Sequence, residues 1–162
     1  MQASEQATPA DWMQYRPTPL PAVTLMQAHF THHAFERHSH AEYGIGLTHS
    51  GVQTFHCGGT TQTSGPGHVI LLNPDQAHDG LPGHDGGYRY SMLYVDPALL
   101  PALRDRVAGG SSASYFRETV IHAPPMATLL HQAMCATVQE QEKLRAETLL
   151  LDSLLALFIR HG

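Results

Sequence analysis

The sequence has little charge, only two cysteines and no long apolar run. Lys, Arg, Asp and Glu make up 14% of the 162 residues and hydrophobic residues 42%, which excludes a charge-rich disordered chain. Cys57 and Cys135 form no close-spaced motif, so a reduced, cytoplasmic protein is expected. No apolar run reaches the roughly 18 residues of a membrane span, and residues 1–10 lack the apolar core of a signal peptide.

A basic surface is also missing. The formal net charge is −5 with histidine neutral, and Lys and Arg are scattered singly along the chain. Proteins that bind nucleic acids neutralise phosphates with clustered cations, so this piece of chain is not expected to bind DNA. Histidine is instead abundant, with thirteen residues, and this abundance is a reason to look for a metal site.

The chain begins with an arm, which a β-rich region follows. Several prolines exclude a regular helix from residues 1–22, which leaves a disordered tail or an aromatic-bearing arm that docks on the rest. From residue 23 to about residue 96, short apolar runs are separated by Gly, Pro and Asn. The expected strands are 23–30, 42–49, 52–57, 68–72 and 88–95. Many short strands with regular turns predict an antiparallel sandwich or barrel.

Residues 111–162 are expected to form a linker and two helices. Before them, at the end of the 23–110 region, a short helical stretch is expected over 97–107. Pro124 and Pro125 then begin a helix that reaches about residue 141, and a second helix covers about 143–161. Apolar side chains occupy most of the circumference of this second helix. This apolar surface is wider than one face of a barrel can cover. The helix either packs on two sides within the monomer or buries one face in a partner, and a homodimer is the favoured interpretation.

The segment from Arg37 to Tyr43 carries the first candidate site. Side chains alternate along a strand, so His38, His40 and Glu42 are expected to share one face. Two imidazoles and a carboxylate on one face form half of a divalent metal site; the alternative is a row of polar side chains facing solvent. His78 follows a Gly-Pro-Gly turn, a buried strand and Asn73-Pro74, and in a closed barrel it would face the same site.

These motifs resemble those of the cupin superfamily. In more detail, HSHAEYGIGLTHSGVQTF, GHVILLNPDQAHDG and YRYSMLYVDP, in this order, resemble the N-terminal effector-binding domain of AraC-family transcription regulators over roughly residues 25–160. The resemblance implies a mainly β fold: a cupin barrel (a double-stranded β-helix, or jelly roll) over 23–110, then an antiparallel helix pair that joins two chains in a homodimer. It also implies a DNA-binding helix-turn-helix domain that is absent from this chain.

The chain departs from the usual metal-binding cupin at one ligand. In the family, three or four residues separate the second histidine from a glutamate ligand. The corresponding positions of this chain are Gly44 and Ile45. The predicted metal ligands are therefore His38, His40 and His78, with Glu42 as a substitute fourth. Such a set suits Zn, Ni, Fe or Mn, and no organic cofactor is expected. An effector bound without any metal is the alternative.

The barrel interior is the expected effector pocket. Tyr88, Tyr90 and Met92 alternate on one strand and share a face, as the walls of a small-molecule pocket require; the alternative is that they are core. His56, on another strand, is a further candidate for effector binding. The remaining histidines, His49 and His131 among them, show no spacing that pairs them with the motif and are expected at the surface.

Two functions remain open. The first is a non-enzymatic sensor in which a small molecule binds in the barrel, with or without a metal, and shifts the arm or the helix pair. DNA would then be bound only through the missing domain, and no membrane is involved. The second is a metal-dependent cupin enzyme, such as a dioxygenase or isomerase, in which the same ligands leave an open metal position.

Overall fold

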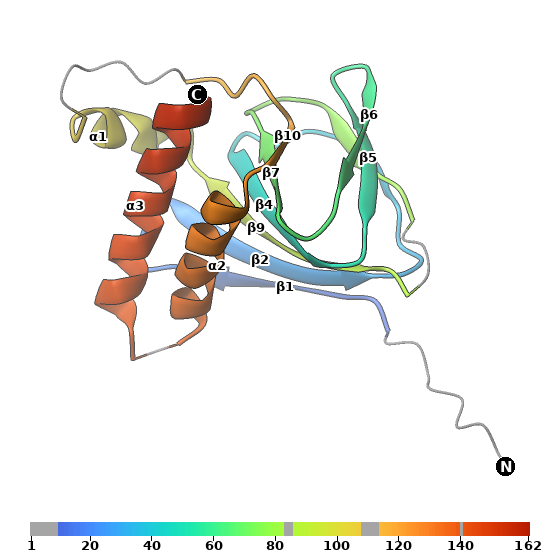
Figure 1. Ribbon diagram of the computed structural model, residues 1–162, viewed down its shortest axis with the longest axis horizontal. Helices are drawn as coiled ribbons and strands as arrows, with labels where there is room; N and C mark the ends of the chain where they lie inside the picture. The colour runs from blue at the N-terminus through green and yellow to red at the C-terminus, as the bar shows by residue number, and fades with distance from the viewer. Residues whose placement is uncertain (1–9, 83–85, 108–113, 140) are drawn as a thin grey trace, which may run out of the picture.

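The computed structural model describes residues 10–82, 86–107, 114–139 and 141–162 (Figure 1). Residues 1–9 of the expected arm, and the expected boundary at residue 110, lie outside the described residues. The described residues form two antiparallel sheets followed by helices. The larger sheet has the order β1 (Trp12–Pro17), β2 (Val23–Phe30), β9 (Tyr88–Val95), β4 (Tyr43–Ser50), β7 (His68–Leu72) and β10 (Val120–His122). The smaller has the order β3 (Phe35–His38), β8 (His78–Gly80), β5 (Gln53–Cys57) and β6 (Thr60–Ser64).

The helices come after β9 and cover one face of the larger sheet. A 3-10 turn, η1 (Pro97–Leu99), leads into the short α1 (Leu100–Arg104), and α2 (Pro124–Val138) and α3 (Lys143–His161) follow. Figure 1 shows α2 and α3 side by side, with the strands of the larger sheet beside them. The prediction of a mainly β, cupin-type barrel followed by a helix pair is therefore confirmed.

The inner strands of the larger sheet, such as β4, β7 and β9, are buried on both faces, which explains why they read as nearly continuous apolar runs. On β9, Leu93 and Val95 face the core beneath the helices, whereas Tyr90 and Met92 face the barrel interior. The alternation of side chains along a strand separates the two sets. One core thus lies between the sheet and the helices, and the second lies between the two sheets.

The strands of the larger sheet were the more predictable ones. Strands 23–30, 68–72 and 88–95 have the predicted bounds, and 43–50 is shifted by one residue at both ends. In the smaller sheet, 53–57 begins one residue later than predicted. The sequence interpretation missed β1, β3, β6, β8 and β10. β3, β6 and β8 belong to the smaller sheet, where β6 reads TTQTS and β8 has three residues. β1 and β10 are the edge strands of the larger sheet; β1 is largely exposed and β10 has three residues. β10 pairs with β7, so the sheet extends into the segment expected to be a linker.

The second long helix has two apolar stripes. One stripe is buried against the rest of the chain and includes Leu150, Leu154 and Leu157, each fully buried. The other stripe lies about a third of a turn away on the helical wheel and remains partly or largely exposed. Its members are Leu144, Leu151, Leu155 and Ile159. Packing within the chain buries the first stripe. In the second stripe Leu151 and Leu155 pack only partly against the core, and Leu144 and Ile159 remain exposed.

A buried asparagine ties the barrel to the helices. The Asn73 side chain accepts a hydrogen bond from the Phe116 N–H (2.7 Å) and donates one to the Phe116 carbonyl (3.0 Å). The Phe116 ring in turn stacks on that of Phe158 in α3, with ring centroids 4.8 Å apart. Asn73 is 3% exposed, so water cannot replace either hydrogen bond.

We expect Asn73→Ala to lower the free energy of unfolding by about 2–4 kcal/mol, because it leaves two buried backbone groups of Phe116 unsatisfied. Urea denaturation measures the change. Gln14→Ala is the matched control, since the Gln14 amide makes a hydrogen bond to Gln27 at the surface; it should cost less than about 0.5 kcal/mol. Equal midpoints for the two variants would contradict the structural role of Asn73.

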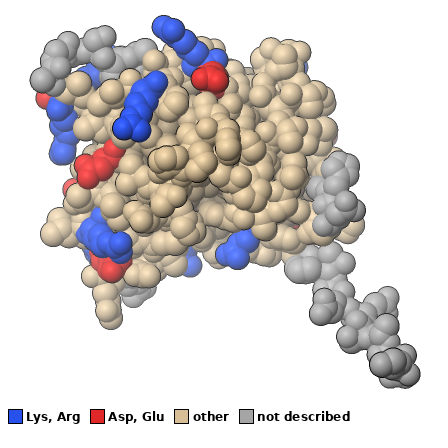
Figure 2. Space-filling model, in the orientation of Figure 1, with Lys and Arg blue, Asp and Glu red and all other residues tan. Residues whose placement is uncertain are grey.

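Charge is sparse on the surface of the described residues. On the face seen in Figure 2, Lys and Arg lie singly or beside an acidic side chain and form no continuous basic area there. The two ion pairs of the described residues join His56 to Asp79 and Arg145 to Glu142. Among the described helices, none is both long and apolar enough to cross a bilayer.

Candidate functional site

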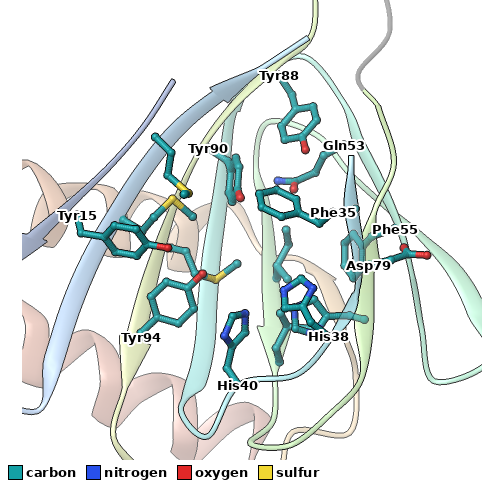
Figure 3. Close-up of a pocket in the computed structure, with 17 residues that line it drawn as sticks. Tyr15, Phe35, His38, His40, Gln53, Phe55, Asp79, Tyr88, Tyr90 and Tyr94 are labelled. Atoms are coloured by element: carbon teal, nitrogen blue, oxygen red, sulfur yellow. The ribbon is translucent and has the colours of Figure 1, made fainter. Parts of the chain in front are cut away.

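The barrel interior contains a cavity of about 90 Å³. Both sheets line it: β9 contributes one wall, β3, β5 and β8 contribute the opposite wall, and β1 contributes to the rim (Figure 3). Two glycines on the inner face of β4 keep the space between the sheets open. A Cβ at Gly46 would lie 3.0 Å from Met92 Cε, and one at Gly44 would lie 3.2 Å from Met92 Sδ. Larger residues at these positions would push Met92 into the cavity.

Three histidines converge at one end of this cavity. His38 ends β3 and His78 begins β8, and the two are cross-strand partners. His40 follows β3 in a loop whose backbone is fixed, because the His40 carbonyl accepts a hydrogen bond from the Asp75 N–H (2.7 Å). Each histidine offers one ring nitrogen, and these three atoms lie within 4.8 Å of one another. The structure thus brings together the three histidines that the sequence placed in one site.

Backbone contacts orient two of these imidazoles. His38 Nδ1 lies 2.6 Å from the Glu36 carbonyl oxygen, and His78 Nδ1 lies 2.9 Å from the Gln76 carbonyl oxygen. A carbonyl only accepts, so each Nδ1 carries the proton and Nε2 keeps its lone pair. Metal-binding histidines are held in the same way by partners of the second nitrogen.

The surroundings favour neutral imidazoles. Burial lowers the pKa of His40, as does the neighbouring His38, while Glu42 raises it. Burial also lowers the pKa of His78; the Gln76 carbonyl opposes this shift, and the other two histidines add to it. A neutral imidazole is the form that binds a metal ion. The donor set therefore fits a divalent transition metal of the kind predicted.

Glu42 differs from its expected place. β3 ends at His38, so residues 39–42 form a loop and the strand alternation that put Glu42 beside the histidines does not apply. Glu42 is exposed and lies outside the group of three histidines. Its charge reaches His40, but its carboxylate is not positioned as a fourth ligand.

The predicted aromatic wall lines the cavity. Tyr88, Tyr90, Met92 and Tyr94 all border it, since the residues between them face the helices or the exterior. Burial raises the pKa of Tyr88 to about 12 and raises the pKa of Tyr90 and Tyr94 as well. Among the described residues, no side chain or backbone group pairs with the three hydroxyls. They are neutral hydrogen-bond donors directed at the cavity.

His56 lies on the opposite face of its strand from the cavity. Gln53, Phe55 and Cys57 are the buried residues of β5, so His56 points outward and its side chain is 54% exposed. There its Nδ1 pairs with Asp79 Oδ2 at 2.8 Å. The alternation of the apolar residues Phe55 and Cys57 could have shown which face of this strand points inward, and that His56 lies on the other face.

The arm contributes residues that the sequence interpretation did not assign to the site. β1 pairs with β2 along its full length, and Met13 and Tyr15 border the cavity. The arm is anchored by Asp11, whose carboxylate accepts hydrogen bonds from three successive backbone N–H groups at Thr31, His32 and His33. Burial opposes ionisation of Asp11, but these donors lower its pKa to about 2.

Three further lining residues were also missed, namely Phe35, Gln53 and Phe55. Phe35 lies on β3 and the other two on β5, both in the smaller sheet. β3 was not predicted as a separate strand, and the inward face of β5 was assigned to the wrong residues. Their inward positions follow from the pairing of β3 and β5 with β8, which the sequence does not display.

Comparison with known proteins gives one family and one curated relative. The model of the AraC-like ligand binding domain matches residues 20–159. An uncharacterized HTH-type transcriptional regulator of Bacillus subtilis, YbfI, is 27% identical over 129 residues, which are 78% of this chain and 46% of the relative. The chain thus spans about half the length of that relative.

Solved structures with a similar fold are more distant. A conserved cupin 2 barrel protein from Salinispora arenicola has a TM-score of 0.48 and 17% identity, over 66% of this chain and 97% of that one. An oxalate decarboxylase from Bacillus subtilis, studied for its Mn(II) centres, has a TM-score of 0.46 and 13% identity, over 53% of this chain and 25% of that one. At these values the likeness concerns the fold alone.

Proposed function

Because this chain belongs to the family of AraC-like ligand binding domains, we propose that it is the sensing domain of a transcription regulator and binds a small effector in the barrel cavity. The observation that carries the proposal is the cavity itself, where Tyr88, Tyr90 and Tyr94 present unpaired hydroxyls. Neutral phenol donors select hydrogen-bond acceptors. The effector is therefore a small molecule with hydroxyl, carbonyl or carboxylate oxygens.

A divalent metal at His38, His40 and His78 is the second element of the proposal. The geometry in its favour is the convergence of three ring nitrogens within 4.8 Å and the orientation of two rings by backbone carbonyls. When bound, a metal with three protein ligands supplies an open coordination position for an oxygen ligand. The histidines lie at one end of the cavity, so an effector oxygen at that position would also be within the reach of the tyrosine wall.

The third element is a homodimer through α3. Its support is the exposed stripe that includes Leu144, which is 78% exposed, and Ile159, which is 52% exposed. Apolar side chains aligned on one helix face are characteristic of helix-to-helix interfaces. DNA contact in the regulator is assigned to a helix-turn-helix segment like that named for the Bacillus relative, not to residues 20–159.

Effector binding is tested by thermal unfolding in the presence of small sugars, aromatic acids and short alcohols. A ligand at one hundred times its dissociation constant should stabilise the native state by about 2.7 kcal/mol. Tyr90→Phe removes one hydroxyl from the cavity and should weaken this ligand about 2- to 13-fold, because a hydrogen bond contributes about 0.5–1.5 kcal/mol. Tyr115→Phe, at a tyrosine that is 58% exposed, should leave the affinity unchanged.

The same samples separate a sensor from a cupin enzyme. A sensor returns its ligand chemically unaltered after incubation, as chromatography and mass spectrometry of the small molecules would show. Turnover that stops on chelation of the metal would instead support the enzyme. If no compound stabilises the protein, or if Tyr90→Phe and Tyr115→Phe respond alike, the cavity is not the effector site.

A further inference from the structure

Two histidines and a cysteine, residue types that can bind metal ions, lie together on the opposite side of the larger sheet, between β4 and α2. They are His49 on β4 and His131 and Cys135 on α2. They border a hollow of about 380 Å³ between the sheet and the helix, together with Ser91 and Met134. We propose that these three residues form a second metal site that takes a thiophilic divalent ion, with Zn²⁺ as the best match. The site goes beyond the proposed effector-sensing function and does not depend on it.

The helix supplies two of the ligands at a favourable spacing. His131 and Cys135 are four residues apart, so they occupy the same helix face. His131 Nε2 lies 3.4 Å from Cys135 Sγ. Tetrahedral zinc with a Zn–N distance of about 2.05 Å and a Zn–S distance of about 2.3 Å separates its nitrogen and sulfur ligands by about 3.6 Å. The pair is therefore already near the separation that a shared ion would impose.

The strand supplies the third ligand. His49 continues the row of Tyr43, Ile45 and Leu47 that faces the helices, since side chains two residues apart lie on one face of a strand. Its ring meets the ring of His131 edge to face, with 5.5 Å between centroids. The three proposed ligands do not form an assembled group of ligand atoms like that of the barrel histidines, so binding a shared ion requires the exposed His131 side chain to rotate towards His49.

The surroundings of His49 prepare it to act as a ligand. His49 Nε2 lies 2.7 Å from Ser91 Oγ, and with Nε2 donating to that oxygen, Nδ1 keeps its lone pair. Burial, with smaller contributions from His131 and Arg89, lowers the pKa of His49 to about 4. The imidazole is therefore neutral at pH 7. Ser91 is 1% exposed, so the hydrogen bond that fixes the ring is protected from water.

The chemistry of the donors selects the ion. One thiolate and two imidazoles suit zinc and other borderline or soft metals, whereas magnesium and calcium require oxygen ligands. Arg89 also borders the hollow, and a thiolate bound to the ion would offset its positive charge. His131 and Cys135 are exposed, which leaves the fourth position open to water.

Cobalt(II) is the probe that tests the assignment, because a thiolate bound to Co²⁺ gives an intense charge-transfer band in the near ultraviolet. The barrel histidines contain no sulfur, so this band does not report on them. We expect the band in the wild-type chain and its loss in Cys135→Ser. Cys57→Ser is the matched control: Cys57 is the other cysteine and is buried in the barrel, so its substitution should leave the band in place.

The histidine ligands are tested by thiol protection. Zn²⁺ should slow alkylation of Cys135 by iodoacetamide at least tenfold, and His49→Ala or His131→Ala should remove at least nine-tenths of that protection. His32→Ala, at another exposed histidine, should leave it unchanged. Far-ultraviolet circular dichroism checks that each variant is folded.

Three results would overturn the proposal. The first is a wild-type chain without a cobalt–thiolate band. The second is a band that survives in Cys135→Ser. The third is protection that is equal in His49→Ala and His32→Ala, which would reduce the site to two neighbouring residues of one helix. Loss of the barrel metal in a His78 variant, with the thiolate band retained, would show that the two sites are independent.

Discussion

His78→Ala should abolish metal binding in the barrel, lowering the affinity by at least about 100-fold. Even an outer-shell partner of a metal ligand contributes about 10- to 100-fold to affinity, and His78 is one of only three nitrogen ligands in its group. We expect close to one equivalent of metal in the wild-type chain after loading with Zn²⁺, Ni²⁺, Mn²⁺ or Fe²⁺ and desalting. Elemental mass spectrometry on the purified, untagged chains measures the change. The assay is run in the Cys135→Ser background so that only the barrel is counted.

Two controls make this result specific. His56→Ala removes a neighbouring histidine that points out of the barrel and should leave the metal content unchanged. Glu42→Ala removes the carboxylate that sequence placed in the site, and it too should have little effect, because Glu42 lies outside the histidine group. His40→Ala, in the loop after β3, repeats the loss without altering a strand. A metal content that is equal in His78→Ala and His56→Ala would refute the barrel site.

Leu151→Lys/Leu155→Lys should convert the chain from a dimer to a monomer. Burial of one leucine contributes about 1.5–3 kcal/mol, and in a symmetric dimer each substitution acts on both chains. The double variant therefore removes up to roughly 6–12 kcal/mol of association energy and adds four positive charges to the contact. Sedimentation velocity at micromolar concentration measures the outcome.

The control for this variant adds the same charge elsewhere. Thr61 and Thr63 are exposed on β6, in the sheet that faces away from the helices, so Thr61→Lys/Thr63→Lys should sediment as the wild-type chain does. A wild-type chain that is monomeric at micromolar concentration would refute the dimer. A double-leucine variant that remains dimeric would move the interface to another surface.

Sequence predicted those parts of the fold in which hydrophobic burial determines the pattern. The inner strands of the larger sheet are buried on two faces and stand out as apolar runs, so 23–30, 68–72 and 88–95 have the predicted bounds. The smaller sheet has one face in water, and its strand β6 carries polar residues throughout. Such a strand is specified by its pairing partner, which lies elsewhere in the chain, and a local pattern cannot show it.

The same distinction applies to the site. His38, His40 and His78 could be named from their spacing and from the cupin resemblance, and the structure places them together. Glu42 was assigned by extending strand alternation four residues past the end of β3, where the chain had already turned. The group of His49, His131 and Cys135 could not be predicted from sequence spacing. His49 and His131 are 82 residues apart and come together only when α2 packs on the sheet. Its local sign was the His131-Cys135 pair on one helix face.

β9 has a mechanical consequence for signalling. Tyr90 on one face of this strand borders the cavity, and Leu93 on the other is fully buried beneath the helices. Both faces of this strand are packed against other side chains. Close-packed interiors compress little and transmit strain, so a displacement on one face of the strand also moves the other. A ligand that pushes on the tyrosine wall therefore pushes on the support of α2 and α3 as well. If the proposed effector binds in the cavity, β9 would couple the tyrosine wall directly to the core beneath α2 and α3, because its residues belong to both cores.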